Sequence, residues 1–179
     1  MINRLAKFND LIPSSLPFVE GRLEGHRERK NYTIIGRGVA EDSKQSVKIQ
    51  SLHGYNLGAV SAMPKNGSGL HSHTTAEVFV IYSGKWRFYW GADGKNEIIL
   101  NQGDIISMPT NMFRGFENAG KEQGLIFVVL GNHLFKPNFF SQYMDDHIFY
   151  MAEDLGLCTY EKHHKQNCAQ RKQNLVITF

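Results

Sequence analysis

Short segments with the composition of β-strands follow one another through most of this chain. They are rich in β-branched and aromatic residues and are bounded by glycine, asparagine, aspartate and serine, the pattern of strands in all-β proteins. Ser83–Gly84, Asp93–Gly94 and Gly103–Asp104 are suited to the turns between them. The segments are 32–35, 47–50, 55–62, 77–82, 86–90, 97–100, 104–108, 113–117 and 125–130. This succession predicts an all-β sandwich or barrel.

Two neighbouring strands show how such a barrel would pack. Residues 86–90 alternate, with Trp86, Phe88 and Trp90 on one face, as expected for a strand with one side in the core. Residues 78–82 are apolar on both faces, which predicts a second covering layer outside the barrel. Either the N-terminal arm or another subunit would supply that layer, and we favour a homodimer.

The chain divides into a barrel and flanking segments. After Pro137 the apolar residues recur every three or four positions, the period of an amphipathic helix that packs on the barrel. Residues 1–30 have few periodic apolar positions and read as a loose or partner-packed arm. The expected organisation is an N-terminal arm (1–30), a β-barrel (31–136), a packing helix (137–156) and a C-terminal tail (157–179).

A cluster of possible metal ligands lies just before the strand at 77–82. His71 and His73 are two residues apart, so on a strand their side chains point to the same face. Glu77 follows four residues later and can turn to meet them. Two imidazoles and one carboxylate form a facial set that holds a divalent metal and leaves positions open for substrate. Fe, Mn, Ni and Zn all suit these donors, and no organic cofactor is indicated.

The spacing His71-x-His73-x3-Glu77-x6-Gly84 resembles the first motif of the cupin family, in which the two histidines and the glutamate are metal ligands. A stretch similar to the second motif runs from Gly103 through Pro109 to Asn118. The resemblance covers roughly residues 55 to 131 and implies a double-stranded β-helix, the jelly-roll barrel of cupins.

Three positions depart from the family pattern. Lys65 and Asn111 stand where cupins have glycines, and Arg114 stands where they have a fourth ligand histidine. Arginine has no lone pair to give, and a guanidinium about 5 Å from a divalent ion would be repelled by ~6–7 kcal/mol before compensation. Arg114 therefore either swings away from the metal, clamps an anionic substrate, or pairs with Glu77 in a metal-free pocket.

The resemblance implies a small-molecule enzyme of oxygenase, decarboxylase, lyase or isomerase type that acts on a small, anionic substrate. A dioxygenase-like reaction would place Arg114 on the substrate's carboxylate or phosphate. The alternative is a metal-free module that binds a sugar or carboxylate without catalysis. A third reading is a metal-free sugar-phosphate epimerase with His71 or His73 as general base. We expect His53 and His133 to be surface residues, and Asn118 and Gly103 to be turn residues.

Composition limits the partners. The formal net charge of +3 is too small to indicate a nucleic-acid-binding protein, and the basic runs at 27–30 and 162–172 read as solvated termini. No apolar run approaches the length of a membrane span, and the N-terminus lacks the apolar core of a signal peptide. Cys158 and Cys168 are too few for a disulfide framework, so we expect a cytoplasmic protein.

Overall fold

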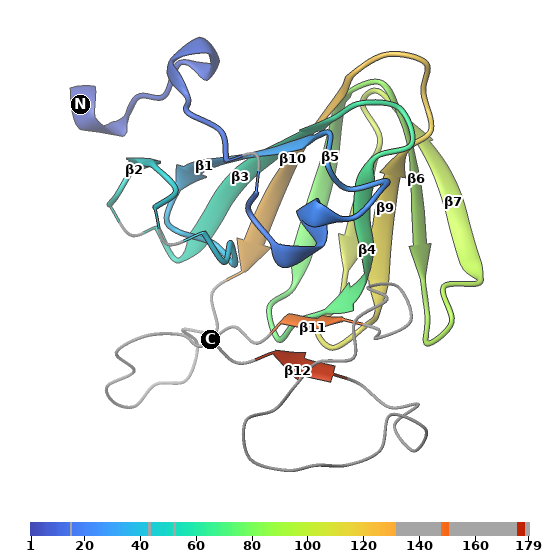
Figure 1. The fold of residues 1–179 in the computed structure, drawn as a ribbon. Coiled ribbons are helices and arrows are strands. Elements are labelled where there is room, and N and C mark those ends of the chain that lie inside the picture. The colour runs from blue at the N-terminus through green and yellow to red at the C-terminus, as the bar shows by residue number, and fades with distance from the viewer. Residues whose placement is uncertain (15, 43, 52, 132–147, 151–174, 178–179) are drawn as a thin grey trace.

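Two six-stranded β-sheets face each other in the computed structural model (Figure 1). It describes residues 1–131 except 15, 43 and 52, together with 148–150 and 175–177. The first sheet has the order β2 (Val47–Ile49), β1 (Arg29–Ile35), β3 (Tyr55–Ala62), β10 (Gly124–Gly131), β5 (Glu77–Ser83) and β8 (Ile105–Met108). The second has the order β12 (Leu175–Ile177), β11 (Ile148–Tyr150), β4 (Gly67–Ser72), β9 (Arg114–Asn118), β6 (Lys85–Trp90) and β7 (Asn96–Asn101).

The all-β class is confirmed, although the sheets do not close into a continuous barrel within the described residues. Every strand expected from the sequence is present, with ends shifted by a few residues. None of the helices in the described part of the chain is long and apolar enough to span a membrane.

Strand β4 is not among the strand segments expected from the sequence. It opens Gly67-Ser-Gly69, a composition with low strand propensity, yet all of its residues are buried. A Cβ atom at Gly67 would lie 1.8 Å from the carbonyl oxygen of Phe116 on the paired strand β9. Because Gly67 has no side chain, the two backbones can approach this closely. The glycine that lowers the strand propensity of this segment therefore also allows the strand to pack.

The core lies between the sheets and is rich in aromatic rings. Phe79, Trp86 and Phe88 are fully buried, the last two as the alternation of residues 86–90 predicted. The Phe79 ring lies 4.9 Å from that of Phe88 and 5.4 Å from that of Phe116. Such tilted aromatic contacts hold the two layers together at the end of the core that borders the candidate site.

The two missing motif glycines keep a glycine-like backbone. Lys65 has φ 62° and Asn111 has φ 59°, both in the left-handed region. Asparagine tolerates this region better than lysine does, because its short polar side chain can hydrogen-bond locally. The chain therefore retains the turn geometry at both positions without the glycines.

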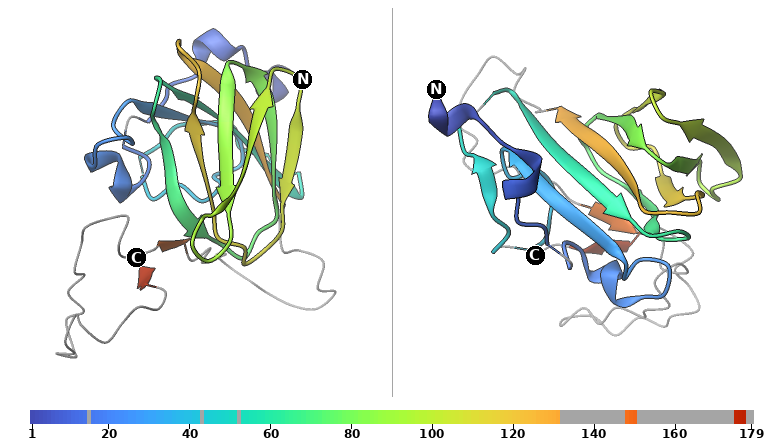
Figure 2. Two further views of the ribbon diagram at one scale, coloured as in Figure 1. Left: turned by 90° about the vertical axis from the view of Figure 1, so that its right-hand side faces the viewer. Right: turned by 90° about the horizontal axis from the view of Figure 1, so that it is seen from above.

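The N-terminal arm packs on its own chain. It contains the 3-10 helices η1 (Ile2–Arg4), η2 (Phe8–Asp10) and η3 (Val19–Arg22). The Phe8 ring lies 5.0 Å from Tyr32 and 6.3 Å from Phe127, so the arm covers part of the outer face of the first sheet (Figure 2). Glu20, in η3, is 1% exposed. The expectation of a loose arm is thus corrected, since its second half enters the protein interior.

The expected helix at 137–156 lies mostly outside the described residues. Its described part, Ile148–Tyr150, is strand β11, which pairs with β4. The correction at these residues reflects an ambiguity of short apolar runs, which fit a strand edge as well as a helix face. Of the tail at 157–179, only β12 is described. The domain boundaries remain a prediction.

Candidate metal centre and its cavity

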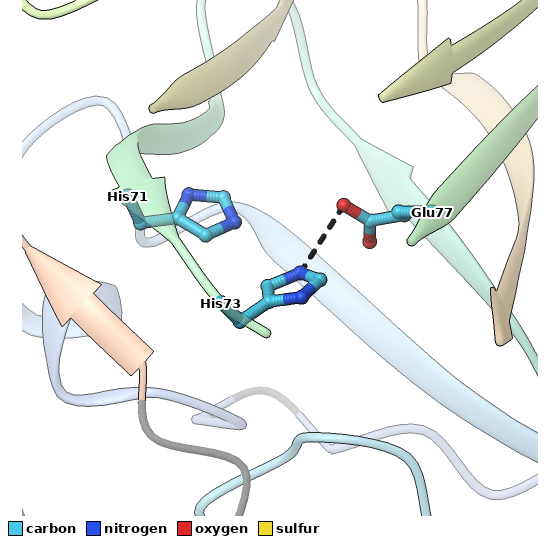
Figure 3. A group of neighbouring side chains, drawn as sticks. All are labelled: His71, His73 and Glu77. Atoms are coloured by element: carbon cyan, nitrogen blue, oxygen red, sulfur yellow. Dashed lines mark ion pairs between the residues drawn. The ribbon is translucent and has the colours of Figure 1, made fainter. Parts of the chain in front are cut away.

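The two histidines and the glutamate meet at the end of β4 and the start of β5. His71 lies on β4, His73 follows the last residue of that strand, and Glu77 is the first residue of β5. All are buried, and one ligand atom from each lies within 4.8 Å of the others. Figure 3 shows the side chains turned toward one another. Their convergence matches the cluster expected from the sequence, and their assignment as ligands stays a prediction.

His71 is held as a neutral imidazole. Its Nδ1 lies 2.7 Å from the carbonyl oxygen of Gly69. Donation of Nδ1–H to this oxygen places the lone pair on Nε2, the form that binds metals. Burial, followed by the charge of Arg114, lowers the pKa of His71 from 6.5 to about 4. The side chain is therefore uncharged at neutral pH, as a metal ligand must be.

His73 lies between a hydroxyl and a carboxylate. Its Nδ1 is 2.6 Å from Oγ1 of Thr75, which is 1% exposed, and its Nε2 is 3.3 Å from Oε2 of Glu77. The dashed line in Figure 3 marks the second contact. The Thr75 hydroxyl holds Nδ1, so Nε2 is the nitrogen that faces Glu77 and the cluster.

Glu77 is a carboxylate at neutral pH. Burial would raise its pKa, but the hydrogen bond and charge of His73, together with the charge of Arg114, lower it to about 2. A buried carboxylate beside two imidazoles is a ready cation site.

Arg114 is committed to this cluster. It is fully buried in β9, and its Nε and Nη2 donate to Oε2 of Glu77 at 3.2 and 3.1 Å. Its Nη1 donates to the carbonyl oxygen of Met112 at 3.0 Å. Its Nη2 also lies 3.0 Å from Nδ1 of His73 and contacts Nε2. These contacts correspond to the alternative in which Arg114 pairs with Glu77. Arg114 is not among the described residues that line the neighbouring cavity.

The two imidazoles and the carboxylate are suitable ligands for a divalent metal, but the Arg114 guanidinium competes with a metal for them. Within the described residues, the contacts of Glu77 fall on Oε2, so Oε1 has no partner among these residues. Against this, Nη2 of Arg114 touches two of the candidate ligands and repels a second cation. The carboxylate between the two charges reduces that repulsion.

The cluster forms part of the wall of a cavity of about 80 Å³ between the sheets. This is several times the ~10–15 Å³ that a cavity needs to hold one water molecule, so it has room for a few waters or a small organic molecule. His71, His73 and Glu77 lie on its wall together with the apolar side chains of Phe79, Phe116, Val128 and Leu130, and with the polar residues Arg29, Asn31 and Gln45. Apolar walls with a few polar groups are typical of a small-molecule site.

A second buried charge pair lies next to the cluster and was missed by the sequence reasoning. Oε1 of Glu20 accepts from Nη1 of Arg29 at 2.5 Å and from Oγ of Ser68 at 2.7 Å. That hydroxyl is also 3.3 Å from Nδ1 of His71. Burial would raise the pKa of Glu20, but Arg29, with smaller effects from His71, His26 and Ser68, lowers it to about 2. The pair links the N-terminal arm to the first candidate ligand.

Arg29 belongs to the basic run at 27–30 that was expected to be solvated, and it is instead 1% exposed. The expectation failed because β1 begins at Arg29, three residues earlier than predicted. Once β1 is extended, Arg29, Asn31 and Thr33 fall on one face by the period-2 rule. No comparable signal in the sequence points to Glu20.

Comparison with known proteins supports a cupin assignment for this domain. Residues 59–130 match the family profile described as "Cupin domain". The fold is similar to the polyketide cyclase RemF from Streptomyces resistomycificus (TM-score 0.52, 15% identity, covering 77% of this chain and 87% of that one). It is also similar to an RmlC-like cupin from Shewanella frigidimarina (TM-score 0.50, 12% identity, 73% and 91%).

A structure reported for the DMSP lyases RdDddP and RnDddQII gives a TM-score of 0.50 at 15% identity and 74% coverage of this chain. The chain spans 62% of that structure's length. At these identities the likeness concerns the fold alone. A search of curated proteins finds no match.

Proposed function

We propose that this chain is a cupin that binds a divalent metal through His71, His73 and Glu77 and acts on a small anionic molecule. The observation that carries the proposal is the meeting of a neutral imidazole, a second imidazole and an ionised carboxylate on the wall of one cavity. The reaction would be of the oxygenase, decarboxylase, lyase or isomerase type.

The residues of the chain would prepare the site in distinct ways. Gly69 and Thr75 orient the two imidazoles, and Arg114 holds one oxygen of Glu77. Phe79 and Phe116 limit the water around the substrate. A bound divalent metal would supply Lewis acidity toward a substrate oxygen, and the low-dielectric wall would strengthen that effect.

A metal-free binding module is the second candidate. It is favoured by the contacts of Nη2 of Arg114 with both His73 and Glu77, because the guanidinium then satisfies the same groups that a metal would bind. The epimerase reading receives less support. A His71 pKa of about 4 makes that imidazole a weak general base at neutral pH.

The test is turnover of a panel of small carboxylates and sugar phosphates by the full-length protein. Each substrate is assayed after removal of metal with a chelator and again after addition of Fe(II), Mn(II), Ni(II) or Zn(II). Turnover that needs metal and disappears in His71→Ala supports the proposal. Activity that persists after chelation would instead assign metal-free chemistry to this cavity.

A homodimer remains part of the proposal. The outer face of β5 and its neighbour β8 exposes Tyr82 (57%) and Ile105 (63%), on a sheet that the arm covers only in part. Large exposed apolar side chains on one sheet favour a partner there. Light scattering on the purified chain measures the mass directly, and a monomer at micromolar concentration would contradict this part.

A further inference from the structure

Arg29 carries donors for which the described protein offers no acceptor. The side chain is 1% exposed, and its Nη1 is satisfied by Glu20 at 2.5 Å and by the carbonyl oxygen of Gly67 at 2.8 Å. Its Nε and Nη2 are buried without a hydrogen-bond partner among the described residues. Buried N–H groups left unpaired cost free energy, and those of a charged group cost the most.

Arg29 belongs to the wall of the cavity that also holds the candidate metal ligands. Arg29 and His71 both lie on this wall, with Ser68 between them, since its hydroxyl contacts Glu20 on one side and His71 on the other. The ring of Phe18, also on the wall, lies 5.3 Å from Cζ of Arg29 and supports the flat face of the guanidinium. The guanidinium that carries the unpaired donors therefore belongs to a residue of the wall around the place where a substrate would sit.

The geometry of the unpaired edge selects its ligand. Nε and Nη2 form one side of the planar guanidinium and donate two parallel hydrogen bonds, which match the two oxygens of a carboxylate. Glu20 already holds the opposite part of the group through Nη1, so the edge is fixed in place before a ligand arrives. A preorganised fork of this kind loses little side-chain entropy on binding.

Two other residues that line the cavity carry unpaired acceptors. Oδ1 of Asn31 and Oε1 of Gln45 are buried without partners among the described residues, and both residues line the cavity. Asn31 is two residues beyond Arg29 on β1, about 6–7 Å along the strand. The Gln45 amide is oriented by donation of its Nε2 to the backbone oxygen of Asn31 at 3.0 Å. Each of these two oxygens can accept a hydrogen bond from a donor on the ligand, such as a hydroxyl group.

We propose that Arg29 binds the carboxylate of a small hydroxy acid, with Asn31 and Gln45 accepting from its hydroxyl group. The substrate's anion is thereby assigned to Arg29 and not to Arg114, whose nitrogens are all occupied. This assignment deepens the proposed function, on which it rests only in treating the cavity as the substrate site. The ligand is limited to a few carbon atoms by the cavity of about 80 Å³.

The experiment measures binding, which does not require turnover. Isothermal titration with hydroxycarboxylates of two to five carbons is compared with the matching neutral amides, using the full-length protein with and without metal. At least one acid should bind about tenfold or more tightly than its amide, since an amide cannot accept two hydrogen bonds at the fork. Equal binding of acid and amide, or binding of neither, would overturn the proposal.

Substitutions at Arg29 and at a control site test whether Arg29 is the residue that binds the acid. Arg29→Gln should weaken binding of that acid by at least about tenfold. Because this change leaves Glu20 buried without its partner, the double variant Glu20→Gln/Arg29→Gln serves as a second form that removes both charges. Arg87→Gln is the matched control, since Arg87 pairs with Glu97 on the surface and should bind as the wild type does. Unchanged affinity in a folded Arg29 variant would contradict the assignment, as would an equal loss in Arg87→Gln.

Metal content is measured on the same samples, so the two proposals fail separately. Metal bound to the wild type and retained in Arg29→Gln, with no selective acid binding, would refute only the role of Arg29. Selective acid binding that depends on Arg29 in a protein that takes up no metal would refute only the metal site.

Discussion

Arg114 and Glu77 form a buried ion pair in which Nε and Nη2 both donate to the same carboxylate oxygen, at 3.2 and 3.1 Å. The pair joins β9 to β5 across the two sheets. Oε2 is also the oxygen that lies 3.3 Å from Nε2 of His73, so the pair places a fixed positive charge beside a candidate metal site. The affinity of that site for metal therefore depends on Arg114.

Arg114→His is expected to raise metal affinity roughly 100-fold or more, because it removes the repelling charge and adds a third imidazole, and so a fourth ligand, near the cluster. Competition with a chelating dye measures the Kd. Arg87→His, on the surface, is the control and should leave the Kd unchanged. An unaltered Kd in Arg114→His would show that the guanidinium does not influence metal binding.

Thr75→Val is expected to weaken metal binding by about 10–100-fold, because the hydroxyl 2.6 Å from Nδ1 of His73 orients that imidazole. The valine is similar in shape, so the change removes chiefly the hydrogen bond. Thr75→Ser should restore most of the affinity. Equal affinity in the valine and serine variants would mean that the hydroxyl has no positioning role.

Glu20 should make stability depend on pH in a defined window. Its pKa falls from 4.5 in the unfolded chain to about 2 in the folded protein, so its contribution is present above pH 4.5 and is lost as the pH falls toward 2. The shift corresponds to roughly 3 kcal/mol in the free energy of unfolding. Urea unfolding at pH 6 and at successively lower pH measures this loss.

Glu20→Gln should lack that part of the pH dependence and should be less stable at pH 6, where Arg29 loses its charged partner. Glu97→Gln is the control, because Glu97 is an exposed partner of Arg87 and should contribute at most about 1 kcal/mol. If Glu20→Gln follows the wild-type curve between pH 4.5 and 2, the charge pair is not a source of stability.

Lys65→Gly should stabilise the protein by up to about 1 kcal/mol, because glycine adopts the left-handed backbone at φ 62° without strain. The relief of this strain should exceed the cost of the larger conformational entropy that glycine gives the unfolded chain. Asn111→Gly should change stability by less, because asparagine already tolerates φ 59°. Lys85→Gly, in β6, is the control and should destabilise. Thermal unfolding measures all three variants, and a lower Tm for Lys65→Gly would contradict the account.

The sequence predicts the strands of this fold well because apolar and polar residues alternate along them, and this alternation indicates which face of each strand is buried. It also brings His71, His73 and Glu77 together, since short-range spacing on adjoining strands determines their approach. It does not predict β4, whose glycines have little strand propensity but meet a close backbone contact. It also misses Glu20, because the contact of the arm with Ser68 and Arg29 joins residues far apart in the chain.

The role of Arg114 could be narrowed from sequence only to alternatives, because a guanidinium can clamp a substrate or pair with a carboxylate. The contacts of Arg114 with Glu77, His73 and Met112 favour the pairing with Glu77, and the role of Arg114 stays a prediction. Arg29, one of the arginines that line the cavity, lies on β1, in a run that was expected to be solvated until the strand is extended to it.

Metal content tests the central claim most directly. Protein purified without a metal-affinity tag is analysed by plasma mass spectrometry, as isolated and after reconstitution with each candidate metal, beside His71→Ala and the control His53→Ala. His53 contacts Ser51 and Arg4 and is not part of the cluster. The account predicts about one metal per chain in the wild type and in His53→Ala, and close to none in His71→Ala. A wild type that takes up no metal after reconstitution would contradict the account and leave the cavity as a metal-free binding site.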